Sequence, residues 1–189
     1  MALMNIHQLS VIYLDERDRI LVRFNTTQAE ELRLWLTRRL VSRVMAPLRE
    51  AVGQLETRRS PLPTDDPQTR QMLTQLRRAQ AMQQSDFATP YRDTPDKLPL
   101  GSKPLVVTQL RITVQADGQL HLGFEERLTD QADVRGFQVA MESAMVHGFM
   151  HLLEAAVARA EWGIASAHGQ DISVSGEEWQ DPSAPKYLQ

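Results

Sequence analysis

The residues with the clearest potential for chemistry are two histidines in the last third of the chain. His147 and His151 are four residues apart, one helical turn, and Glu154 follows three residues later. Two imidazoles at this spacing can bind one metal ion, and a carboxylate one turn further can supply a third ligand. The glutamate that zinc hydrolases carry directly after the first histidine is missing, as is their downstream ligand. A metal site is therefore less favoured than the simpler interpretation, in which these side chains form a solvent-exposed polar stripe on the helix.

A second group with chemical potential combines arginines with a tryptophan on one predicted helix. The side of this helix that lies opposite its apolar residues carries Trp35, Arg38, Arg39, Arg43 and Arg49. Guanidinium groups bind phosphates and an aromatic ring stacks on a base, so this face is a candidate nucleic-acid surface. The alternative is that Trp35 packs over a sheet edge with Arg39 across its ring. Arginine outnumbers lysine 18 to 3, and the net charge is −3, which both count against nucleic acid.

No spacing in the chain is typical of nucleophilic or acid–base catalysis. The serines do not lie in a nucleophile elbow, and the nine glycines form no phosphate-binding cluster. Glu125-Glu126 and Glu177-Glu178 are adjacent carboxylates, which generally point in different directions. We therefore expect no enzyme and no cofactor.

The bulk composition is that of an ordinary globular protein, with 42% hydrophobic and 24% charged residues. The absence of cysteine excludes disulfides and thiolate chemistry. The first residues, MALMNIHQL, have neither the basic region nor the apolar core of a signal peptide. The most apolar stretch, residues 137–160, is interrupted by charged residues and histidines. We expect a cytoplasmic protein with no membrane partner.

Charge is distributed unevenly along the chain. Residues 1–104 hold 16 basic and 12 acidic side chains, whereas residues 105–189 hold 5 and 12. The two parts therefore carry +4 and −7. Such asymmetry indicates a polyanionic partner or head-to-tail self-association, unless it only reflects local helix electrostatics.

Two similar segments are predicted to build the fold. In the first, strands at 8–14 and 19–24 lead into a helix that a capping box of Thr27 and Glu30 would start. In the second, strands at 110–115 and 120–124 flank the Asp117-Gly118 turn and lead into a helix over 134–162. Between them, Asp66-Pro67 would cap a smaller helix to about residue 84, followed by a proline-rich connection over 87–104.

We therefore predict an α+β fold, in which two β-hairpins form a four-stranded antiparallel sheet packed against two long helices. The single domain covers residues 1–165, with unit one at 5–57, the connection at 58–104 and unit two at 105–165. Residues 166–189 form a polar acidic tail. Gln8-Leu9 matches Gln109-Leu110, so the units suggest a ββα duplication, with coincidence as its rival.

The last predicted helix is apolar over most of its circumference. If one sheet and one other helix cannot cover it, a second subunit must, and twofold homodimers are the commonest solution. This observation predicts self-association.

Residues 4–9 (MNIHQL) and 30–40 (EELRLWLTRRL) resemble a family of uncharacterised proteobacterial proteins. The resemblance covers mainly residues 4–40 and implies a bacterial cytoplasmic origin, without an activity. The sequence therefore favours a non-enzymatic interaction or adaptor protein that self-associates and binds a protein partner. The alternative is a nucleic-acid-binding module at Trp35 and the arginines, and the third interpretation is a metal-dependent enzyme at His147 and His151.

Overall fold

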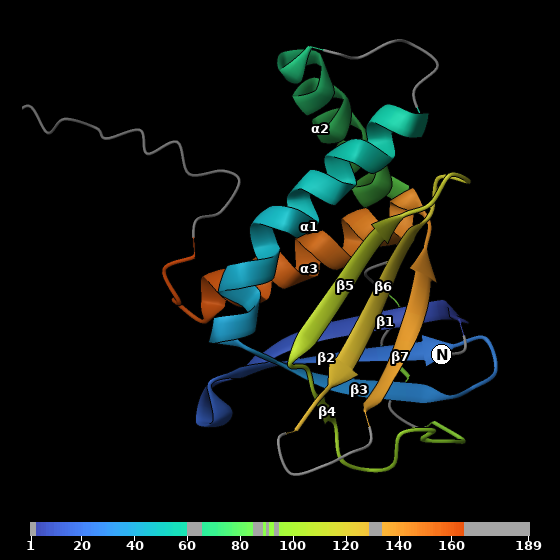
Figure 1. Ribbon diagram of the computed structural model, residues 1–189, viewed down its shortest axis with the longest axis vertical. Coiled ribbons are helices and arrows are strands. Elements are labelled where there is room, and N and C mark those ends of the chain that lie inside the picture. The colour runs from blue at the N-terminus through green and yellow to red at the C-terminus, as the bar shows by residue number, and fades with distance from the viewer. Residues whose placement is uncertain are drawn as a thin grey trace, which may run out of the picture.

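The computed structural model describes residues 3–59, 66–84, 89, 91–92, 95–128 and 134–164. Its strands are β1 (Leu3–Leu14), β2 (Arg19–Thr26), β3 (Glu31–Thr37), β4 (Leu105–Val106), β5 (Gln109–Val114), β6 (Leu120–Glu126) and β7 (Arg135–Met141) (Figure 1). Its helices are α1 (Arg38–Arg59), α2 (Pro67–Gln84) and α3 (Ser143–Arg159), with a 3-10 turn, η1, at Asp15–Arg17. The predicted acidic tail, 166–189, lies outside the described residues.

All strands belong to one mixed sheet in the order β4-β3-β2-β1-β7-β6-β5. The α+β class is confirmed, and so are the two predicted hairpins, which are β1–β2 and β5–β6. The predicted four-stranded antiparallel sheet is wrong, because the sheet has seven strands and contains two parallel pairings, β1 with β7 and β3 with β4. The prediction of two long helices is also corrected, since the described chain contains three helices of 17 to 22 residues.

The error arose where strands β3 and β7 were assigned to helices. In β3, Leu32, Leu34 and Leu36 alternate with polar residues or tryptophan and point into the core. This period of two is typical of a strand with one face buried. Neither strand is separated by a loop from the helix that follows it, since α1 begins directly after β3. The predicted helix start at Thr27 is therefore wrong, and α1 begins at Arg38.

Each half of the fold is a three-stranded antiparallel meander followed by a helix, so the repeated unit is βββα rather than the predicted ββα. The halves keep their register from the third strand into the helix, because buried residues of β3 and β7 correspond at a spacing of 105 and α1 and α3 begin at residues 38 and 143. The strand pairs are Leu32 with Phe137, Leu34 with Val139 and Leu36 with Met141. Buried helix positions correspond at the same spacing: Val41 with Val146, Met45 with Met150, Leu48 with Leu153 and Ala51 with Ala156.

The sheet curls until its two ends meet. Residues 105–114 pair first with β3 and then, after a bend at residues 107–108, with β6. At the bend, the Val107 amide donates to the Trp35 carbonyl (3.1 Å) and the Thr108 amide donates to the Glu125 carbonyl (2.9 Å). The two edge strands β4 and β5 are thus consecutive in the chain, and β5–β7 cross over β1–β3 (Figure 1).

Helices α1 and α3 each pack on the first full strand of the other half, α1 on β5 and α3 on β1. Phe24, Phe124, Phe137 and Phe149 meet in the core between them, with ring centroids 5.2–6.2 Å apart. Helix α2 lies across α1 and α3 (Figure 1). The apolar circumference of α3 is thus covered within one chain, so burial of α3 no longer requires a second subunit.

The described part of the proline-rich connection runs along the outer face of β1–β3. The Arg23 guanidinium lies 4.3 Å from the centroid of the Tyr91 ring, and the Tyr91 hydroxyl lies 2.8 Å from the buried Glu31 carboxylate. These contacts fix the connection to the sheet. Over the described ranges, no helix is both long and apolar enough to cross a bilayer.

Candidate functional site

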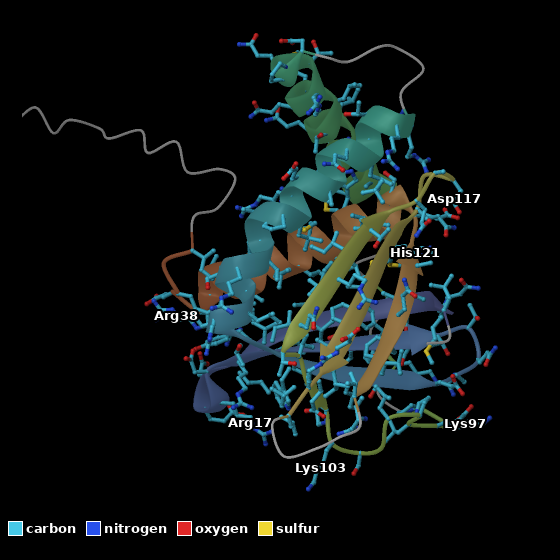
Figure 2. All side chains as sticks on the ribbon, viewed as in Figure 1. Arg17, Arg38, Lys97, Lys103, Asp117 and His121 are labelled. Atoms are coloured by element: carbon cyan, nitrogen blue, oxygen red, sulfur yellow. The ribbon has the colours of Figure 1, made fainter. Side chains whose placement is uncertain are left out.

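The structure separates the tryptophan of the predicted nucleic-acid face from its arginines. Trp35 lies in β3, is 6% exposed, and carries the Arg17 guanidinium 5.2 Å from its ring centroid. Arg38, Arg39 and Arg43 are exposed on the first turns of α1, and Arg38 points away from the body of the protein (Figure 2). Because the ring is almost fully covered, it cannot stack on a base in this conformation.

The remaining arginine of that set, Arg49, meets two residues of the predicted metal set in a pocket between the three helices. The pocket holds about 150 Å³. It is lined by Arg49 and Val52 of α1, by Gln71, Thr74, Gln75 and Arg78 of α2, and by His147, Met150 and Glu154 of α3. The exposed side chains of Gln71 and Gln75 form its rim. Sequence analysis thus selected three lining residues but assigned them to two different sites.

Glu154 is held between two guanidinium groups in this pocket. Its Oε1 lies 3.3 Å from Arg49 Nε, and its Oε2 lies 2.9 Å from Arg78 Nη2. Arg49 and Glu154 are also equivalent positions of the two halves, 105 residues apart. The Glu154 carboxylate thus links a guanidinium group of α1 to one of α2.

Next to the pocket, a buried carboxylate joins all three helices. Glu56 Oε1 accepts a hydrogen bond from the Ser143 hydroxyl and lies 3.2 Å from His147 Nε2, while Oε2 lies 3.7 Å from Arg77 Nε. Burial, the largest influence, raises the Glu56 pKa, but the hydrogen bonds from His147 and Ser143 and the charges of His147 and Arg59 outweigh it. The pKa of Glu56 therefore lies below its ordinary value.

This cluster does not have the geometry of a serine nucleophile. In a catalytic triad the serine hydroxyl contacts one imidazole nitrogen, and the carboxylate contacts the other. Here Ser143 and His147 both converge on the same oxygen of Glu56. The arrangement is suited to holding α1 and α3 together.

The predicted metal ligands each have other partners. His147 contacts Glu56, and Glu154 contacts the two arginines, while His151 of the same helix is not among the residues that line the pocket. Across the residues that the structure describes, no group of three His, Asp or Glu side chains is placed to hold a metal ion.

Helix α2 lines the pocket with polar residues and exposes two of its apolar side chains, whereas its Ala81 is buried and its Leu73 and Met82 are half-buried. Gln71, Thr74, Gln75 and Arg78, at the i, i+3, i+4, i+7 spacing of one helix face, line the pocket. Met72 and Leu76 are 70% and 55% exposed. Sequence analysis missed the three uncharged polar lining residues and Arg78, because a glutamine-rich segment resembles any solvent-exposed helix.

The start of α2 agrees with the sequence prediction. The Asp66 carboxylate accepts hydrogen bonds at 2.8 Å from the Thr69 amide and from the Thr69 hydroxyl. These bonds hold the pKa of Asp66 below its ordinary value. The predicted N-cap at Asp66-Pro67 is confirmed.

Comparisons with protein-family models, curated proteins and solved structures found no match for this chain. We therefore infer a function from the pocket and from the exposed face of α2.

Proposed function

We propose that this protein is a non-enzymatic interaction module that docks a segment of a protein partner on the outward face of α2. The observation that carries the proposal is the exposure of Met72 and Leu76, one helical turn apart on the same face. Covering both side chains would contribute about 2 kcal/mol to binding.

The charge of α2 defines the chemistry of the partner. Within residues 67–84 the chain has no acidic residue, and its Arg70 and Arg77 are exposed, whereas Arg78 lines the pocket. A matching partner segment is therefore acidic and amphipathic, so that its apolar side covers Met72 and Leu76 and its carboxylates face Arg70 and Arg77. Two copies of α2 would repel each other, which favours a different protein over a symmetric contact through this helix.

The test begins with a photo-crosslinking amino acid at Gln80, one turn beyond Leu76, in cells of the native host. The crosslinked protein is identified, and its purified segment is titrated into the full chain by calorimetry. We expect an acidic segment whose affinity falls about 30-fold in the Met72→Ser/Leu76→Ser double variant.

The matched control is Ile12→Ser, which removes a 40% exposed apolar side chain from β1 and should leave the affinity unchanged. Equal binding to the double variant and to the wild type would reject the proposal. Crosslinks to further copies of this chain alone would replace it with the self-association that the sequence predicts.

A further inference from the structure

We infer that the pocket between α1, α2 and α3 binds a small neutral aromatic alcohol of the phenol class. This site is separate from the proposed docking face, because neither Met72 nor Leu76 lines the pocket. Three properties of the lining select the ligand. These are the pairing of its ionisable groups, the size and apolar character of its walls, and a hydrogen-bond acceptor on α2.

The ionisable groups of the lining already have partners, which favours a neutral ligand. Arg49 and Arg78 both contact the Glu154 carboxylate, at 3.3 and 2.9 Å. His147 contacts the buried carboxylate of Glu56 at 3.2 Å. Burial of a charge is costly unless the charge is paired. A charged ligand would therefore have to displace one of these partners, whereas a neutral ligand leaves all of them in place.

The apolar walls of the pocket enclose the volume of one aromatic ring. The buried side chains of Val52 on α1 and Met150 on α3 form the apolar part of the lining. A cavity of about 150 Å³ accommodates a benzene-sized group. The thioether of Met150 adds a preference for an aromatic ring, because its sulfur makes favourable contacts with ring edges. A single ring therefore suits this space better than fused rings or a long chain.

Thr74 of α2 supplies a hydrogen-bond acceptor for the ligand. Its hydroxyl donates to the Arg70 carbonyl at 2.9 Å, so its only O–H hydrogen is used within the helix. The lone pairs of the same oxygen can still accept. Thr74 therefore pairs with a ligand that donates, such as a phenol, and not with an ether or a ketone. The amides of Gln71 and Gln75 at the rim can donate to the phenol oxygen in return.

Titration of the full chain with phenol, followed by NMR on the backbone amides, is the direct test. We expect a Kd of about 1 mM or below, with the largest shifts at residues that line the pocket, such as Val52, Thr74 and Met150. Anisole has no hydrogen to donate and should bind at least about fivefold more weakly. Benzoate is charged and should bind at least about tenfold more weakly.

Substitutions of threonine separate the acceptor from the shape of the pocket. Thr74→Val removes the acceptor at nearly constant volume, so it should weaken phenol binding about fivefold or more and anisole binding much less. Thr74→Ser keeps the hydroxyl and should restore most of the affinity. The matched control is Thr57→Val, because the Thr57 hydroxyl also donates to the carbonyl four residues earlier, that of Gly53 at 2.8 Å, but lies outside the lining. This variant should bind phenol as the wild type does.

The inference is rejected if phenol at about 10 mM shifts no amide of the pocket, or if anisole or benzoate binds as tightly as phenol. Equal phenol affinities of Thr74→Val and Thr57→Val would also reject it. Tighter binding of N-acetyltyrosinamide than of phenol would overturn it by assigning the pocket to the tyrosine of a peptide. The NMR spectrum of each variant shows whether it is folded, and if Thr74→Val is not, the comparison of phenol with anisole on the wild type decides.

Discussion

At the scale of single residues, Glu56 shows how one carboxylate can hold three helices. The side chain belongs to α1, is 2% exposed, and is contacted by Ser143 and His147 of α3 and by Arg77 of α2. A buried charge is tolerated when such partners replace water. Loss of the carboxylate would leave the serine and histidine without their common acceptor.

The lowered pKa of Glu56 predicts an acid-sensitive contribution to stability. Because the folded-state pKa lies below the ordinary value of 4.5, the contribution is complete above that value and is lost as pH falls through the folded-state pKa. In urea unfolding, Glu56→Gln should lower the free energy of unfolding by about 1–3 kcal/mol at pH 7. As the pH is lowered from 7, the free energy of unfolding of this variant should also decrease less than that of the wild type.

The control for this experiment is Glu50→Gln, at an exposed glutamate of the same helix, which should follow the wild-type pH dependence. Parallel curves for Glu56→Gln and the wild type would contradict the prediction.

Sequence spacing found His147 and Glu154 but not their chemistry. Their i, i+7 spacing, with His151 at i+4, suggested a metal site, yet His147 contacts Glu56, 91 residues away, and Glu154 contacts Arg49, 105 residues away. A local pattern places side chains on one helix face. It contains no information on which distant side chains face them.

At the scale of elements, α3 contains a glycine whose substitution should stabilise the helix. Gly148 is buried, and a Cβ added there would meet no other atom within 4 Å. Gly148→Ala should therefore raise stability by about 0.5–1 kcal/mol, because alanine loses less backbone entropy in a helix. Scanning calorimetry should show a Tm higher by about 1–4 °C.

The contrasting variant is Gly118→Ala in the β5–β6 turn. Gly118 has a φ of +79°, and its added Cβ would lie 3.3 Å from the Arg59 side chain. This variant should lower the Tm, since alanine is strained in that backbone conformation. A lower Tm for Gly148→Ala would show that α3 has no room for the added methyl group.

The missed strands have a physical explanation at this scale. Between β3 and α1 the hydrophobic period changes from two to 3.6 residues without a glycine, a proline or a polar loop. Thr37, the last residue of β3, marks the change, since its hydroxyl accepts the Leu40 amide at 3.3 Å. That threonine was an available N-cap signal. Thr27 with Glu30 resembled a stronger N-cap signal, although Thr26 is the last residue of β2 and Thr27 lies in the β2–β3 turn.

At the scale of the whole molecule, one carboxylate joins the strands at the place where the two edges of the sheet meet. Glu126 of β6 is buried, and its Oε1 accepts the Val106 amide of β4 at 2.8 Å. Its Oε2 accepts Arg135 Nη1 at 3.0 Å, and the same guanidinium donates to the Leu100 carbonyl at 2.7 Å. The side chain thus joins β4, β6 and β7 at one point.

Removal of this carboxylate should weaken the closure. Glu126→Ala leaves the Val106 amide without its acceptor, so we expect a loss of about 1–3 kcal/mol in the free energy of unfolding. Hydrogen exchange of the Val106 amide should accelerate more than exchange in the β1–β2 ladder. The matched control is Glu142→Ala, at an exposed glutamate, and equal exchange rates at Val106 in both variants would contradict this role.

The sequence by itself determined the α+β class, both hairpins and the N-cap of α2, because these features depend on residues a few positions apart. Only the tertiary structure decided the parallel pairings, such as Met4 with Val139, and the closure of the sheet. It also decided which residues of α2 line the pocket and brought Arg49, Arg78 and Glu154 together. Helical periodicity separates a polar face from an apolar face. Which of the two faces the protein depends on the shape and charge of elements that lie far away in the chain.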